Sequence, residues 1–334
     1  HGTITVVADG HSFEVTTLRR DIETDGRHAV VAFTTDWHVD ALRRDFTINA
    51  LSANADGNVF DTVGGIDDLK SRRVRFIGDA TSRIREDYLR ILRFFRFTSA
   101  YAQGQPDAQG LAASVDLKSG MRQLSAERIG AEMMKFIVTP RAGEIARVMQ
   151  ASGIFETLVP LPAHPERLIR MQAIELALGD KPDAIARLAA LFVTLPTTAP
   201  TLAQNFRFSS ADLAALTAAA DLNEGHDAGS SERAAKEQIY RSGPTAFGRA
   251  IRVAWSRSAG PIPDAPWIEK CRLAATWTPP QMPVSGADVI ALGIPAGPRI
   301  GRTLRAFEAW WIASEFTTDP ALHKAKLAEL SAER

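Results

Sequence analysis

β-Branched and aromatic residues open the chain and predict strands within its first 75 positions. Two such runs, at 3–7 and 12–18, flank Asp9 and Gly10. Asp-Gly is typical of a two-residue hairpin turn, because glycine accepts positive φ. Further strands are expected at 30–33 and 58–61, with a helix over 37–54 that begins at Asp36. The pattern therefore predicts a small head of mixed helix and strand.

After residue 75 apolar residues recur every three to four positions, which is the helical period. We expect helices at 84–100, 126–138, 142–151, 165–178, 184–193, 210–222, 231–241, 245–256 and 301–315. Proline-rich stretches at 160–162, 195–200 and 278–280 separate these blocks. The predicted fold class is α+β, with a head over 1–75, a helical neck over 76–150 and a helical body and tail over 151–334.

Composition narrows the class of protein. The chain has 334 residues, with 39 basic and 39 acidic side chains, so a nucleic-acid site must come from local clustering of charge. The single cysteine, Cys271, excludes a disulfide framework and a multi-cysteine zinc site, and favours a reducing, cytoplasmic compartment. No apolar run of about 18 residues occurs, so we expect no membrane span.

Positive charge clusters between residues 70 and 96. This segment holds nine basic and three acidic residues, a local net charge of +6. The helix expected at 84–100 is apolar nearly all round, which indicates that its charges line a pocket. Two interpretations remain open, an anion-binding groove or a solvated basic face with pairs such as Asp87 to Arg90. In the first case Arg72, Arg73 and Arg75 are expected to contact RNA.

A second cluster joins two arginines, a carboxylate and an amide on a short stretch. Arg44 suits phosphate oxygens, whereas Asp45 and Asn49 suit ribose hydroxyl groups. The alternative is a capped, salt-bridged helix start. Glu14 lies in the middle of a predicted strand, where its carboxylate is either salt-bridged or a metal ligand.

Together, several motifs form an ordered series that resembles a known family. The segments 14–19, 44–50, 61–69, 86–90 and 125–129 resemble those of class II tRNA nucleotidyltransferases and bacterial poly(A) polymerases. Segment 285–312 is similar to the tail of bacterial CCA-adding members. The resemblance implies a partial polymerase-β-type head before neck, body and tail. It also implies addition of CMP and AMP to the tRNA 3′ end from CTP and ATP, with Mg²⁺ as cofactor.

The resemblance also implies residue roles. Arg44 would hold the triphosphate, with Asp45 and Asn49 near the sugar. Asp87 and Arg90 would read the incoming base. The remaining assignments are Arg93 and Arg96 for the nucleotide or RNA end, Asp61, Gly64 and Gly65 for a hinge between head and neck, and Glu14 as a third catalytic carboxylate.

One departure from the family pattern concerns its first motif. The Gly-rich loop and Asp-x-Asp, whose aspartates hold the Mg²⁺ ions, are not found in the sequence. We therefore expect an N-terminally shortened CCA-adding enzyme, with no activity of its own until a family-type segment is restored. The alternatives are a poly(A) polymerase, a member that adds only A or CC, and a non-catalytic RNA-binding remnant.

Overall fold

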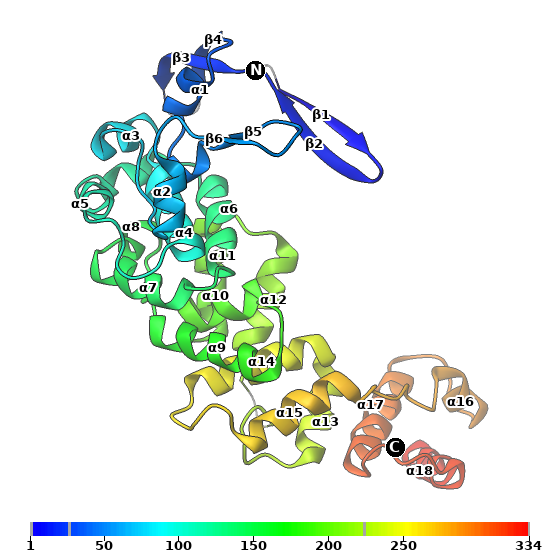
Figure 1. Ribbon diagram of the computed structural model, residues 1–334. Coiled ribbons are helices and arrows are strands. Elements are labelled where there is room, and N and C mark those ends of the chain that lie inside the picture. The colour runs from blue at the N-terminus through cyan, green and yellow to red at the C-terminus, as the bar shows by residue number, and fades with distance from the viewer. Residues whose placement is uncertain (1–2, 26–27, 223–224, 333–334) are drawn as a thin grey trace. The chain divides into compact units, whose positions relative to one another are not determined.

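The computed structural model describes residues 3–25, 28–222 and 225–332 (Figure 1). Its strands form three antiparallel pairs: β1 (Thr3–Ala8) with β2 (His11–Thr16), β3 (Arg19–Asp25) with β4 (His28–Phe33), and β5 (Ser52–Ala53) with β6 (Val59–Phe60). The predicted hairpin turn is confirmed, since Asp9 and Gly10 have φ of 50° and 76°. The strands β3 and β5 were not predicted.

The helix expected over 37–54 is much shorter than predicted. Asp36 caps α1 (Trp37–Leu42) as expected, by accepting from the backbone N–H of His38 at 2.8 Å. The chain then leaves the helix, because Phe46 is fully buried and extended in a backbone bridge to Phe76. The 3₁₀ helix η1 (Thr47–Asn49) and strand β5 follow. Tertiary packing has overridden the local helical pattern.

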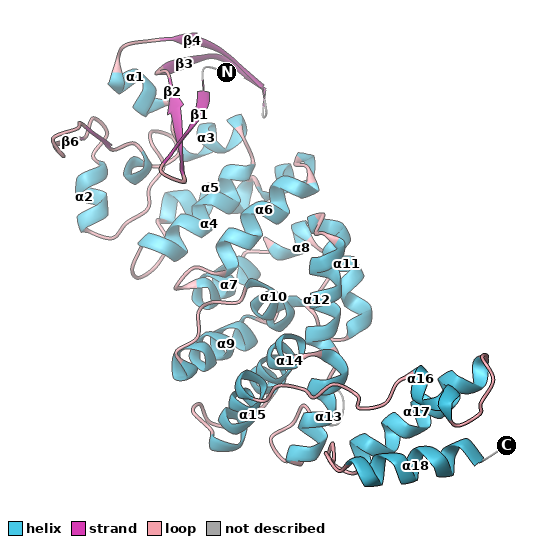
Figure 2. Ribbon diagram, turned by 90° about the vertical axis from the view of Figure 1, so that its right-hand side faces the viewer, coloured by secondary structure: helices cyan, strands magenta, loops and turns pink. Residues whose placement is uncertain are grey.

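One compact unit comprises residues 1–221 and 256–262. After the strands it consists mainly of helices (Figure 2). They are α2 (Gly65–Lys70), α3 (Ala80–Glu86), α4 (Leu89–Tyr101), α5 (Ala108–Asp116), η2 (Lys118–Gln123), α6 (Ala126–Ile137), α7 (Ala142–Ala151), α8 (Phe155–Leu158), α9 (Pro165–Leu178), α10 (Ala184–Phe192), η3 (Pro196–Thr198), α11 (Ala199–Phe206) and α12 (Ser210–Ala220).

The helix expected at 84–100 is in fact two helices, α3 and α4. They are separated at Asp87, whose φ of −159° and ψ of 108° are extended. The expectation that α4 is covered on both sides is confirmed, since Ile91, Leu92, Phe94 and Phe95 are all at most 2% exposed. The arginines of α4 therefore emerge from a helix enclosed in protein.

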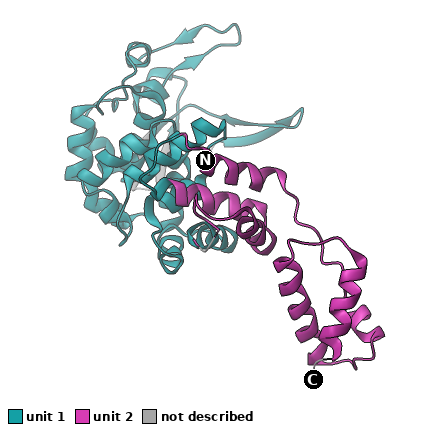
Figure 3. Cartoon of the chain, turned by 90° about the horizontal axis from the view of Figure 1, so that it is seen from below, with its two compact units in different colours: residues 1–221, 256–262 teal, residues 222–255, 263–334 magenta. Residues whose placement is uncertain are grey.

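The second unit comprises residues 222–255 and 263–334 (Figure 3). Its helices are α13 (Glu232–Ser242), α14 (Pro244–Arg257, whose last turn belongs to the first unit), α15 (Ala265–Thr276), α16 (Gly286–Ala291), α17 (Pro298–Ala313) and α18 (Pro320–Ala332). Phe307 and Trp311 of α17 pack with Val289 and Leu327 in a hydrophobic core within this unit. The domain boundaries at 75 and 150 fall inside the first unit and stay predictions.

Among the described residues, no single helix has the length and apolar character needed to cross a membrane. One bent pair of helices, 184–192 with 196–206, meets the length and composition criteria together.

Candidate nucleotide site

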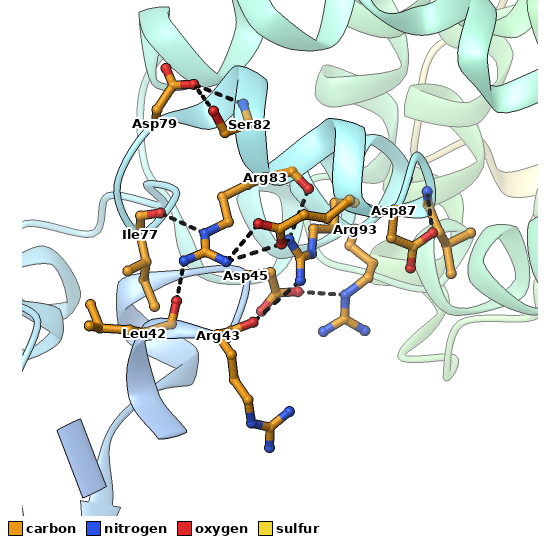
Figure 4. A network of polar contacts seen from close by, with 12 residues as sticks. Leu42, Arg43, Asp45, Ile77, Asp79, Ser82, Arg83, Asp87 and Arg93 are labelled. Atoms are coloured by element: carbon orange, nitrogen blue, oxygen red, sulfur yellow. Dashed lines mark hydrogen bonds and ion pairs between the residues drawn. The ribbon is translucent and has the colours of Figure 1, made fainter. Parts of the chain in front are cut away.

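The candidate site is built around Asp45, which follows α1. Its neighbour Phe46 packs against Phe76, with ring centroids 4.9 Å apart, and so anchors this turn in the core. The buried Asp45 carboxylate accepts from Arg93 Nε on α4 at 2.5 Å and from Asn49 Nδ2 at 2.9 Å. Figure 4 shows the Arg93 side chain reaching Asp45. The structure thus brings together three residues that the sequence assigned to nucleotide binding.

Arg44 lies beside this group and is held by Asp40. Its Nη2 donates to Asp40 Oδ2 at 3.1 Å and its Nη1 donates to the Asn49 carbonyl at 3.2 Å. Burial raises the pKa of Asp40, but the Arg19 N–H and the guanidinium groups of Arg43 and Arg44 outweigh it and hold that pKa below its ordinary value. The Arg44 side chain stays 37% exposed. Part of its guanidinium fork therefore remains available to solvent or an anion.

Arg83 joins α3 to the end of α1 (Figure 4), and Arg90 does the same from α4. Both donate to the carboxylate of Glu86. Arg83 Nε also donates to the Ile77 carbonyl at 3.1 Å, and Arg90 Nη2 donates to the Arg43 carbonyl at 3.3 Å. Glu86 was not among the predicted site residues, although its i,i+4 spacing to Arg90 was a visible signal.

Asp87 occupies the break between α3 and α4. Its Oδ1 accepts from the Leu89 N–H at 3.1 Å and its Oδ2 accepts from Arg128 Nη2 on α6 at 2.6 Å. The alternative of an Asp87–Arg90 pair on a solvated face is not what the structure shows, because Arg90 pairs with Glu86. Arg128 belongs to the expected neck motif 125–129, but nothing local in the sequence indicated that it reaches Asp87.

Arg96 lies farther along α4 and faces another part of α6. Its Nε donates to the buried carboxylate of Glu132. Its guanidinium carbon lies 4.4 Å from the ring centroid of Phe97, and that of Arg93 lies 5.4 Å away. The two arginines thus share a cation–π partner, but Arg96 pairs with Glu132 and contacts neither Asp45 nor Asp87 among the described residues.

The predicted hinge is tightly hydrogen-bonded. Asp61 accepts from the N–H groups of Val63, Gly64 and Ile66 at 2.8–3.0 Å. Gly64 has φ of 82°, in the left-handed region that glycine tolerates. A Cβ on Gly65 would lie 2.3 Å from a backbone oxygen of η1, so only glycine fits this close approach. The geometry explains the glycine pair, and the hinge role stays a prediction.

The three arginines predicted to contact RNA differ in their surroundings. Arg73 is paired with Asp107 at 2.5 Å, and Arg75 with Asp68 at 2.9 Å. Arg72 is exposed and has positive φ, at 50°. Among the described residues it is the one of the three without a carboxylate partner.

The described residues do not form the expected Mg²⁺ site. No three His, Cys, Asp or Glu side chains in the described part of the chain lie together as metal ligands. Glu14 is exposed on β2, opposite Thr5 of β1. We therefore derive no chemical step through a metal ion, and the role of Glu14 as a third carboxylate stays a prediction.

Family models agree with this arrangement of head and helices. A model described as the poly(A) polymerase head domain matches residues 1–75, and one described as a probable RNA and SrmB-binding site of polymerase A matches residues 106–164. The fold and the matched head define a nucleotidyltransferase.

The relatives make the assignment more specific. The mitochondrial CCA tRNA nucleotidyltransferase 1 of Danio rerio is 35% identical over 95% of this chain and 73% of its own length. Its human counterpart is 34% identical over 95% of this chain and 72% of its own length. The chain belongs to the CCA tRNA nucleotidyltransferase family.

Solved structures share the fold. The Bacillus stearothermophilus CCA-adding enzyme in complex with CTP matches with a TM-score of 0.74 and 26% identity, over 98% of this chain and 81% of that one. The Thermotoga maritima CCA-adding enzyme complexed with tRNA matches with a TM-score of 0.62 and 17% identity, over 98% of this chain and 79% of that one. The second likeness concerns the fold alone.

Proposed function

We propose that this member of the family selects CTP and ATP for the addition of CMP and AMP to tRNA 3′ ends, and that Asp87 and Arg90 read the incoming base. The addition step itself is expected to need the Asp-x-Asp segment of the family. Cytosine and adenine both present an amine donor beside an unprotonated ring nitrogen. Uracil and guanine present a carbonyl beside a ring N–H instead. A carboxylate facing the amine and a guanidinium facing the nitrogen therefore accept C and A and leave unmatched groups with U and G.

The observation that carries this proposal is the unused hydrogen-bonding capacity of these two side chains. A carboxylate has about four acceptor positions, and Asp87 uses one on each oxygen, for Leu89 and Arg128. A guanidinium has about five N–H groups. Among the described residues, Arg90 uses Nη1 and Nη2 to donate to Glu86 and to two backbone carbonyls, and its Nε makes no such bond. Both can therefore bind a base without giving up the contacts that position them.

The experiment is a competition between nucleotides for the full chain. We expect radiolabelled CTP, measured by equilibrium dialysis, to be displaced by ATP and by neither UTP nor GTP at equal concentration. Displacement by all four nucleotides would contradict base reading at this site. Binding of ATP without CTP would favour a poly(A) polymerase or an A-adding member, and binding of CTP without ATP a CC-adding one.

Three parts of the proposal rest on the resemblance. The CTP-bound structure named above belongs to another protein, and it supports CTP as a substrate here. The names of the vertebrate relatives, CCA tRNA nucleotidyltransferases, support ATP and the tRNA 3′ end as partners. Mg²⁺ is the proposed cofactor, with no ligand assigned among the described residues. The cytoplasmic location stays a prediction, since the vertebrate relatives are named as mitochondrial.

Replacing Arg72, Arg73 and Arg75 together by alanine is expected to weaken tRNA binding. Each lost phosphate contact reduces the salt dependence of the affinity by about one unit of slope. Arg73 and Arg75 are already paired with carboxylates. Of the three single variants, Arg72→Ala should therefore cause the largest loss of tRNA affinity. A salt titration by filter binding measures both quantities.

Arg147→Ala is the control, because Arg147 is an exposed, ion-paired arginine on α7. It should leave affinity and slope unchanged. If the triple variant behaves in the same way as this control, segment 70–96 does not contact tRNA through these side chains.

A further inference from the structure

A cleft of about 620 Å³ opens within the first compact unit. Its walls come from η2, α6, α11 and the segment from α8 to Pro160. None of the residue roles assigned above uses it, and the part of its lining between residues 121 and 160 lies in the segment matched by the RNA-binding family model. Its volume lies within the range of about 300–1,000 Å³ that is usual for small-ligand sites.

Backbone packing fixes the walls of this cleft. A Cβ on Gly130 of α6 would lie 2.0 Å from the carbonyl oxygen of Phe206, so α6 and α11 are in direct contact there. A Cβ on Gly120 of η2 would lie 2.1 Å from the ring of Tyr88, so η2 is packed against the start of α4. Close packing therefore fixes the backbone positions of η2, α6 and α11 around the cleft.

Two arginines give the cleft its charge. Arg122 and Arg207 line it, and no acidic residue is among the described residues that do so. Arg207 Nε lies 3.6 Å from Glu127 Oε1, and both side chains are 66% exposed. Such an exposed pair contributes little, so an anion that offers a bidentate contact can replace it.

The backbone at Arg207 is unusual. This residue ends α11 in the left-handed region, at φ of 50°. A residue other than glycine or asparagine seldom occupies this position, and strain of this kind occurs preferentially at functional sites. Arg207 is therefore a side chain placed at the cleft in spite of its local backbone cost.

The rest of the lining suits a nucleobase. Leu124 and Leu158 supply apolar surface, and Gln204 and Asn205 supply amide groups. An unpaired base needs this combination, an apolar surface for its face and hydrogen-bonding groups for its edge. A paired base has its edge occupied and its faces stacked, so duplex RNA does not match the lining.

The position of the cleft relates it to the candidate nucleotide site. Helix α6 presents Ile129 to the cleft and the preceding residue, Arg128, to Asp87. We propose that the cleft binds one unpaired nucleotide of the RNA that is extended, with its phosphate on Arg122 and Arg207 and its base against Leu124 and Leu158. This inference rests on the proposed function, because it assumes an RNA substrate. It adds a binding subsite that none of the predicted residues contains.

The test compares two RNA probes with the full chain. One is a minihelix of a tRNA acceptor stem with a four-nucleotide single-stranded 3′ overhang, and the other is the same duplex with a blunt end. We expect the double variant Arg122→Ala, Arg207→Gly to bind the overhang probe about tenfold more weakly, with a salt slope shallower by about one to two units. Binding of the blunt probe should be unchanged.

Two controls separate folding and charge from recognition. Glycine at 207 accepts the left-handed backbone without strain, so Arg207→Gly should not lower the melting temperature. Arg147→Ala removes an exposed arginine elsewhere in the same unit and should leave the affinity for both probes unchanged.

The outcomes distinguish this inference from the proposed function. If the double variant loses affinity equally for both probes, or loses none for either, the cleft is not a subsite for unpaired RNA. A loss of CTP binding in the double variant would also overturn it, because the cleft would then be a site for free nucleotide. Failure of the unmodified chain to bind CTP contradicts the proposed function instead and leaves the comparison of the two RNA probes valid.

Discussion

Asp87→Ala is expected to lower selectivity for CTP over UTP by on the order of 10²-fold or more, because the exocyclic amine loses its acceptor and uracil loses a repulsive neighbour. The structure strengthens this expectation, because Asp87 is oriented by Arg128 at 2.6 Å and by the Leu89 N–H. Equilibrium dialysis with each labelled nucleotide measures the ratio directly.

Asp79→Ala is a matched control at the other end of α3. Asp79 caps that helix by accepting from the Ser82 N–H at 2.8 Å, so its loss should lower the melting temperature and leave base choice intact. Asp87→Ala should show the reverse, a large change in selectivity and a small change in melting temperature. Full selectivity in Asp87→Ala would remove Asp87 from base reading.

Arg93→Ala is expected to destabilise the protein strongly and to weaken nucleotide binding at the same time. It leaves the buried carboxylate of Asp45 without its guanidinium partner. Removing one member of a buried pair costs about 3–5 kcal/mol, and the lower end applies because the Arg93 side chain is 28% exposed. Urea unfolding measures the stability, and CTP dialysis below the transition measures the binding.

The double variant Arg93→Met, Asp45→Asn separates these two effects. It removes both charges together, so most of the lost stability should return. Nucleotide binding should stay weak, because the variant has neither the guanidinium of Arg93 nor the carboxylate of Asp45. If CTP affinity recovers together with stability, the pair serves the fold and does not contact the nucleotide.

Local signals were sufficient for several elements. Asp9 and Gly10 predicted the β1–β2 turn from two residues, and the predicted bounds of α7 and α9 agree with those observed. The Pro-rich stretch at 195–200 separates α10 from α11, as predicted, but α11 itself was not predicted, although proline is well tolerated in the first turn of a helix. In these places the information lies within a few neighbouring residues.

The site itself depended on contacts between distant segments. The break at Asp87 was not predicted, because the residues around it fit a continuous amphipathic helix. Its partner Arg128 lies 41 positions away, and Arg93 lies 48 positions from Asp45. A single sequence identifies which groups suit a nucleotide, whereas only the packing of α4 against α6 and the α1 turn shows which of them meet.

The four-residue turn after β6 has a property that follows from one carboxylate. Burial raises the pKa of Asp61, but the surrounding backbone N–H groups outweigh it and keep the pKa below its ordinary value. A lowered pKa means that Asp61 contributes stability above the ordinary aspartate range and loses it as pH falls through the folded-state pKa. The turn is thus acid-sensitive: at neutral pH the Asp61 carboxylate holds the N–H groups around it, and this hold weakens when Asp61 takes up a proton.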